Sequence, residues 1–480
     1  MGASKKKRNN VTNSNKLKNE FQTFQFQYLL VYILTMFADW LQGTHMYALY
    51  DGYATKDIPE DVSEYHPSRY GKVAISTLFI TGFACSGIFG TFVGSLADRY
   101  GRKGGVALFC LLEIAINCME EVEDMRVLLF GRLLGGISTS LLFTSFESWM
   151  VAEHRSRGYP EKWLSTTFGY CQVGNGISAI VAGFVAEYAV GMFGNIGPFR
   201  LAVLLSAIVF FIVITTWTEN RDTQENKTIL GLFPVALEKI WNDPRIMLIG
   251  FTNALFEGAM YTFVFNWVPS IYNVWTNPPL GNVFSSFMTC ITLGGFLYNY
   301  LSSSSGMNMS NANIMIYVLL FSSLSLILPA INPNEFWLVY GGFLLFETCV
   351  GISFACGGGL RSAVMPEDLQ ATIMNIFRIP LNILVVIGTR LDSFATTRQI
   401  FLVCVSWLII ALILQIQFSK YDKEKKDTTL SKTKKIINSN KTPKKTLTKK
   451  KSTPRSSSKK ASTGKRSTRQ KSLNKRKKKN

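Results

Sequence analysis

The chain has 480 residues, of which 48% are hydrophobic and 17% are charged, and its formal net charge is +20. The segment from Lys420 onward holds 25 Lys and Arg against 3 acids, so the remainder of the chain is nearly neutral. The basic charge therefore belongs to a tail, which excludes a basic nucleic-acid-binding fold as its source.

Apolar segments recur along the chain, each close to the length of about 20 residues that crosses a hydrocarbon core of about 30 Å. They follow a polar, basic N-terminal tail at 1–24 that lacks a signal-peptide pattern, so we expect no cleavable leader. Twelve helices are predicted, at 25–50, 70–96, 104–119, 126–151, 164–188, 199–217, 245–268, 281–301, 312–330, 335–359, 369–391 and 397–418.

A polar linker at 219–244 divides these helices into two sets of six, at 25–218 and 245–420. Residues 421–480 are rich in Lys, Ser and Thr and hold few large apolar residues, so we expect a disordered tail. The sequence therefore predicts an all-α membrane protein with twelve transmembrane helices in two six-helix bundles. The tail is either solvated or adsorbed to anionic lipids of the membrane.

The loop between the second and third predicted helices fixes the orientation of the chain. It reads GSLADRYGRK at 94–103, and charges such as Asp98, Arg99 and Arg102 cost about 2.5–3.5 kcal/mol each at mid-bilayer. Short basic loops stay on the cytoplasmic side, so this loop and both termini are predicted to be cytosolic. We expect Asp98 near the positive N-terminal end of another helix.

Several ionisable residues lie inside the predicted spans, where they are functional candidates by default. Arg132 and Arg378 favour an anionic solute, because a guanidinium donates parallel hydrogen bonds to an oxyanion and keeps its charge when buried. Alternatively, the charges neutralise one another, Arg132 with Asp39 or Glu147, and Arg378 with Glu347. The candidates are Asp39, Glu113, Arg132, Glu147, Glu257, Glu347 and Arg378. For Glu113, on the third predicted helix, a structural role is as well supported as a functional one.

No metal, disulfide or cofactor site is predicted. The eight cysteines lie in apolar segments without C-x-x-C spacing. The sequence offers no nucleophile–base pair, zinc spacing or phosphate-binding loop, so an enzyme is disfavoured.

The pattern G-x-x-x-D-R-x-G-R-K at 94–103 resembles the signature loop of the major facilitator superfamily of transporters. In that superfamily, helices 1, 4, 7 and 10 line a central cavity, and most of the intramembrane charges fall on the corresponding predicted helices. Further stretches resemble the molybdate-anion transporter family, namely ADWLQG at 38–43, GRLLGG at 131–136, FESW at 146–149, NPPLG at 277–281, VFSSFM at 283–288 and FRIPL at 377–381.

This resemblance implies uptake of molybdate, a tetrahedral dianion, by two halves that expose a central site alternately to each side. We expect a monomer in the plasma membrane that binds neither cofactor nor nucleic acid. The alternatives are a transporter of sulfate or another small solute, and a membrane receptor or scaffold that transports nothing. We assign substrate binding to Arg132, Arg378, Asn253 and Trp40, and gating or proton coupling to Asp39, Glu147, Glu257, Glu347, Asp98, Arg99 and Arg102.

Overall fold

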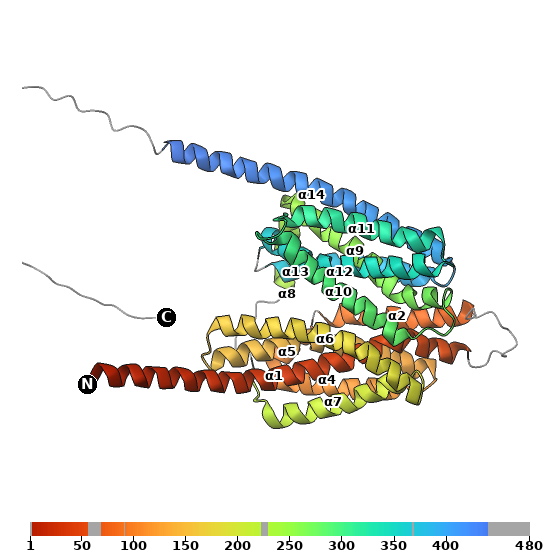
Figure 1. Cartoon of the computed structure of the whole chain (residues 1–480), viewed down its shortest axis with the longest axis horizontal. Helices are drawn as coiled ribbons and strands as arrows, with labels where there is room; N and C mark the ends of the chain where they lie inside the picture. The colour runs from red at the N-terminus through yellow and green to blue at the C-terminus, as the bar shows by residue number, and fades with distance from the viewer. Residues whose placement is uncertain (1, 56–68, 91, 222–228, 367–368, 440–480) are drawn as a thin grey trace, which may run out of the picture. The chain divides into compact units, whose positions relative to one another are not determined.

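The computed structural model describes residues 2–55, 69–90, 92–221, 229–366 and 369–439, and within these ranges every regular element is a helix (Figure 1). Residues 56–68, between the first two predicted helices, lie outside the described residues, as do residues 440–480 of the predicted tail at 421–480. Residues 421–439, expected to be disordered, are part of a helix that continues to Ser439. The helices are α1 Gly2–Thr55, α2 Arg69–Phe89, α3 Val93–Tyr100, α4 Arg102–Met119, α5 Met125–Ser156, α6 Glu161–Phe193, α7 Gly197–Thr216, α8 Ile229–Asn242, α9 Pro244–Tyr272, α10 Leu280–Ser302, α11 Asn311–Ile331, α12 Phe336–Val364, α13 Gln370–Leu391 and α14 Thr397–Ser439.

The predicted all-α membrane fold is confirmed in its class. Among the described residues, nine helices are long and apolar enough to cross a membrane, and α2 adds the shorter apolar helix Ala74–Phe89. The nine comprise α5, α6, α7 and α9 to α14. Two further helices, α1 and α4, coincide with predicted spans but are less apolar than these nine. The helix α1 contains Asp39, and α4 begins with a basic turn and contains Glu113.

One end of the structure, called the acidic end below, carries the loop 120–124 between α4 and α5. There the Tyr53 hydroxyl near the end of α1 donates to the backbone oxygen of Glu120 at 2.6 Å. Arg200 at the start of α7 donates to Glu121 at 2.8 Å. These contacts bring the ends of α1 and α4 and the start of α7 together, as an antiparallel order of successive helices requires.

The opposite end, called the basic end below, carries the signature loop. The backbone N–H of Arg102 donates to the Asn220 carbonyl at 3.0 Å, which ties the loop to the segment after α7. Gly101 has φ 138°, and a Cβ there would lie 2.6 Å from the Glu219 carboxyl carbon. Only glycine therefore fits the reversal between α3 and α4.

The carboxylate of Glu219 caps the start of α4, whereas Asp98 was expected near the N-terminal end of another helix. Glu219 accepts the backbone N–H groups of Lys103 and Gly104, each at 3.1 Å. An acid at this place satisfies free donors of the first turn and complements the helix dipole. Asp98 instead accepts from Arg102 Nε at 2.6 Å, one turn along the loop.

The long helices form two groups that touch along two seams. An N-terminal set consists of α1, α2 and α4 to α7, and a C-terminal set consists of α9 to α14 (Figure 1). The sets meet where α6 packs on α10 and where α2 packs on α13. In the first seam, Glu187 of α6 accepts the backbone N–H of Gly281 at 2.8 Å. In the second, Arg390 donates to Ser76 at 3.3 Å.

The α6–α10 seam depends on small residues. A methyl group on Gly183 would collide with the backbone oxygen of Gly281 and with Ser285. We expect Gly183→Ala to lower the stability of the purified protein by about 1–3 kcal/mol, the usual cost of overpacking. Thermal unfolding in detergent measures this.

The matched control is Gly191→Ala on the same helix, where no atom lies within 4 Å of the new Cβ. This control gains helix propensity and should be neutral or slightly stabilising. Equal unfolding temperatures for both variants would contradict the close seam.

Candidate functional site

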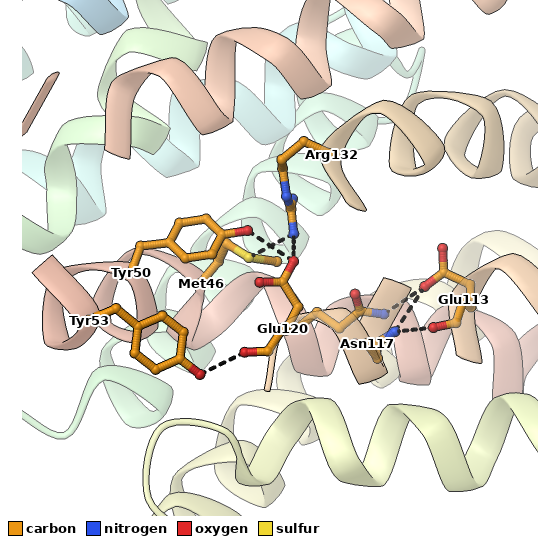
Figure 2. A network of polar contacts seen from close by, with 8 residues as sticks. Met46, Tyr50, Tyr53, Glu113, Asn117, Glu120 and Arg132 are labelled. Carbon is orange, nitrogen blue, oxygen red and sulfur yellow. Dashed lines mark hydrogen bonds and ion pairs between the residues drawn. The ribbon is translucent and has the colours of Figure 1, made fainter. Parts of the chain in front are cut away.

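Arg132 lies at the centre of a polar network near the acidic end (Figure 2). Its guanidinium is paired with Glu120, whose side chain is 1% exposed. The same guanidinium lies over the ring of Tyr50, 5.4 Å from its centroid, and the Tyr50 hydroxyl donates to Glu120 at 2.9 Å. Arg132 Nη2 also contacts the Met46 sulfur at 3.1 Å. Arg132 is therefore already paired with a carboxylate. That carboxylate is Glu120, and not Asp39 or Glu147 as the sequence suggested.

Asp39 lies elsewhere, in a small pocket between α1, α4 and α7 that Glu113 also lines. Glu113 accepts from Gln42 Nε2 at 2.9 Å and from Ser138 Oγ at 2.5 Å. The backbone oxygen of Glu113 accepts from Asn117 Nδ2 at 2.7 Å (Figure 2). Glu113 thus connects α1, α4 and α5, as a structural role would require.

Two other predicted acids, Glu147 and Glu347, form no ion pair with an arginine among the residues that the structure describes. Glu147 is exposed on α5, within electrostatic range of Tyr32 and Cys171. Glu347 is 5% exposed on α12, within electrostatic range of Cys290 of α10.

A pocket in the C-terminal set gathers the other charged candidates. It is formed by α9, α12 and α13, near the basic end where α12 ends and α13 begins. Its cavity volume is about 290 Å³, whereas one water molecule needs about 10–15 Å³ on the same measure, so the pocket admits a small solute. This polar pocket is lined by Asn253, Ala254, Glu257, Arg361, Met374, Phe377, Arg378 and Leu381.

Hydrogen bonds join three residues of the polar pocket across two helices. Asn253 Nδ2 donates to Glu257 Oε1 at 2.7 Å, and Arg361 Nη1 donates to Asn253 Oδ1 at 3.0 Å. Arg361 and Arg378 both lie within electrostatic range of Glu257. The acid near Arg378 is therefore Glu257, whereas the sequence pointed to Glu347.

Arg378 extends from α13 toward the N-terminal set. A Cβ placed on Gly90 would lie 3.7 Å from Nη1 of Arg378. The same Cβ would lie 3.7 Å from Oγ of Ser140 on α5, so Arg378 approaches the N-terminal set at this glycine. On the adjoining turn, the position of a Cβ on Gly87 is 2.7 Å from Asn382 Nδ2. The polar pocket therefore adjoins the seam between the two sets.

Aromatic rings connect the sets on the acidic side of the polar pocket. Phe265 of α9 lies 5.6 Å from Tyr47 of α1 and 5.0 Å from Phe79 of α2, between ring centroids. Tyr261 lies 5.3 Å from Phe83 of α2. Residues 253, 257, 261 and 265 are spaced by four, so one face of α9 changes from polar to aromatic toward the acidic end.

Trp40 lies at a junction of three helices rather than in the polar pocket. Its Nε1 donates to Asn175 Oδ1 of α6 at 2.8 Å. Its ring lies 5.9 Å from that of Phe284 of α10.

Arg361 was missed in the sequence because the predicted helix ended at 359, whereas α12 continues to Val364. One signal could have found it. A Cβ on Gly357 would lie 3.2 Å from Arg361 Nη1, so a glycine one turn earlier leaves room for the guanidinium to fold back over the helix.

Comparison with known proteins places this arrangement in context. A sequence-family model described as sugar transporters with 12 TM segments matches residues 3–354. A molybdate-anion transporter of Xenopus tropicalis is 33% identical over 418 residues, covering 84% of this chain and 87% of the relative. The molybdate-anion transporter of Danio rerio is 29% identical over 440 residues, covering 82% and 87%.

Solved structures share the fold at low sequence identity. The nucleoside transporter NupG superposes with a TM-score of 0.63 at 14% identity, over 83% of this chain and 99% of its own. The peptide transporter POT in complex with sulfate gives 0.64 at 14% identity, over 83% and 94%.

Two neighbouring acids allow a test of the buried network. Glu120→Gln leaves Arg132 enclosed without a counter-charge and should destabilise the protein by about 3 kcal/mol. The measurement is thermal unfolding of the purified protein.

Glu121→Gln is the control, because its side chain is 44% exposed and its pair with Arg200 should contribute less than about 1 kcal/mol. If both variants unfold at the same temperature, Glu120 is not the partner that Arg132 needs.

Proposed function

Because the chain belongs to the molybdate-anion transporter family of the major facilitator superfamily, we propose that it carries molybdate across a membrane as a secondary transporter. The observation that supports this most is the polar pocket, which holds two arginines among apolar helices beside the seam of the two sets. Such a transporter needs no catalytic residue, and we propose that the chain is not an enzyme.

Binding a dianion requires donors that replace its hydration shell. Arg378 offers charged N–H donors in a planar fork, which matches two oxygens of a tetrahedral oxyanion. The Glu257 carboxyl lies within electrostatic range of Arg361 and Arg378. In this proposal Glu257 either carries the coupled proton or forms an ion pair that gates the pocket.

Alternating access would come from motion of the two sets, which we take as two six-helix bundles of twelve transmembrane helices. In this proposal α1 and α4 also cross the membrane, although Asp39 in α1 and Glu113 in α4 lower the mean hydropathy of these two helices. The aromatic contacts of Phe265 close the acidic side of the pocket, and the loop residues Asp98, Arg99 and Arg102 gate the basic side.

The assignment of Arg132 and Trp40 to substrate binding stays a prediction from the sequence. The contacts of both residues lie outside the polar pocket, so neither is a ligand of that pocket in this proposal. We propose that the Arg132–Glu120 pair acts in gating, because an ion pair at the acidic end can exchange partners when that end opens. Asp39, Glu147 and Glu347 remain candidates for proton coupling.

The orientation follows from charge. Short basic loops stay in the cytosol, so we place the basic end and both termini on the cytosolic side. We propose that the membrane is the plasma membrane. We take the protein to be a monomer whose Lys-rich tail contacts anionic lipids.

Uptake of labelled molybdate by liposomes that contain the purified protein tests the function. Arg378→Ala removes a charge-assisted hydrogen bond to the anion, which contributes about 1.5–3 kcal/mol. We therefore expect this variant to lower uptake about tenfold or more. Arg398→Ala removes an exposed arginine at the start of α14 and should leave uptake unchanged.

Normal uptake by Arg378→Ala would remove this arginine from the site. If an equal concentration of sulfate abolishes molybdate uptake, sulfate is the better substrate. Absence of uptake by the wild-type protein, with its cellular function lost only on removal of the tail, would favour a receptor or scaffold.

Glu257 provides a test of coupling. Glu257→Gln keeps the size and the acceptor for Asn253 but cannot bind or release a proton. We expect an inward proton gradient to accelerate molybdate uptake by the wild-type protein and not by this variant. The same acceleration in both would exclude Glu257 as the proton carrier.

A further inference from the structure

The arginines inside the helices differ in what neutralises them. Arg132 is in contact with the carboxylate of Glu120. Within the part of the chain that the structure describes, neither Arg361 nor Arg378 has a carboxylate oxygen within 4.0 Å, and the hydrogen-bond partner of Arg361 is the neutral amide of Asn253. Arg361 is half-buried and Arg378 is exposed, and both line the polar pocket. A positive charge that borders a pocket without a counter-ion in contact is available to an arriving anion.

Asn253 fixes where the Arg361 guanidinium lies. The amide oxygen accepts from Arg361 at 3.0 Å, and the amide nitrogen donates to Glu257 at 2.7 Å. Both ends of the amide are therefore engaged within the protein, which makes Asn253 a positioning residue for Arg361 more than a ligand. Gly357 leaves the space that the guanidinium occupies against α12.

The charges of the polar pocket determine which anions it can hold at low cost. Two guanidinium groups and one carboxylate sum to a single positive charge. A dianion reaches neutrality only when Glu257 takes up a proton, and without Arg361 the same dianion leaves at least one uncompensated negative charge. With Glu257 protonated, the two guanidinium groups carry two positive charges, so a tetrahedral monoanion leaves one of them uncompensated and needs only one arginine. With Glu257 ionised, a monoanion alone neutralises the pocket.

We infer that Arg361 is the second guanidinium of the anion site, held by Asn253. With Glu257 protonated in the bound state, Arg361 and Arg378 together make the pocket select doubly charged tetrahedral oxyanions over singly charged ones of the same shape. This inference rests on the proposed transport of molybdate, since it names the residues that discriminate charge in that site.

Charge selectivity can be measured with two anions of matched shape. Tungstate is a tetrahedral dianion like molybdate, whereas perrhenate is a tetrahedral monoanion of similar size. Each competes with labelled molybdate for the purified full-length protein at pH 7.5, which gives dissociation constants for both. We expect the wild-type protein to bind tungstate more tightly than perrhenate.

Arg361→Gln should weaken tungstate binding about tenfold or more, the loss of one charge-assisted contact, and perrhenate binding much less. Arg361→Lys keeps the positive charge without the planar fork, so it should weaken both anions yet retain the preference for tungstate. Arg155→Gln is the control, because that arginine is exposed at the basic end and pairs with Glu161.

Equal weakening of both anions in Arg361→Gln, with an unchanged tungstate preference, would assign Arg361 a structural role and overturn the inference. Wild-type affinities in Arg361→Gln would overturn it as well. Failure of the wild-type protein to bind molybdate would instead contradict the proposed function on which the inference rests. Thermal unfolding of each variant confirms that the measured protein is folded.

Discussion

A charged side chain among apolar helices needs either a permanent partner of opposite sign or a polar space that a ligand can enter. The arginines of this chain divide along this line. Arg132 is enclosed with Glu120 and Tyr50 near the acidic end, where it joins α1, α4 and α5. Arg361 and Arg378 face a pocket instead, and their nearest acid, Glu257, lies beyond direct ion-pair contact. The first arrangement holds the helices together, and the second leaves charge available for a solute.

The sequence predicted those parts of the fold and site that depend on local patterns. Segment length and hydropathy located the helices to within a few residues at most ends, because crossing a membrane demands a long apolar run. Asn253, Glu257 and Arg378 were identified because a polar group inside such a run is conspicuous. The spacing of four along α9 then places Asn253 and Glu257 on one face, as the structure shows.

Contacts between distant segments could not be read from the sequence in the same way. Glu120 follows the predicted third helix at 104–119, yet the chain folds it inward to meet Arg132 twelve residues later. Glu219, more than a hundred residues from the signature loop, supplies the carboxylate that caps the start of α4. Arg361 followed the predicted end of its helix, where an arginine ordinarily extends toward water. In each case the partner is decided by packing.

The central claim is that the anion lies between Arg361 and Arg378 and leaves Arg132 with its own carboxylate. Tungstate scatters strongly enough to be located in an experimental structure of the protein prepared with that ion. The account predicts tungstate density within hydrogen-bond distance of both Arg361 and Arg378, with the Arg132–Glu120 pair intact. Density bound to Arg132, or at a place that neither Arg361 nor Arg378 reaches, would contradict it.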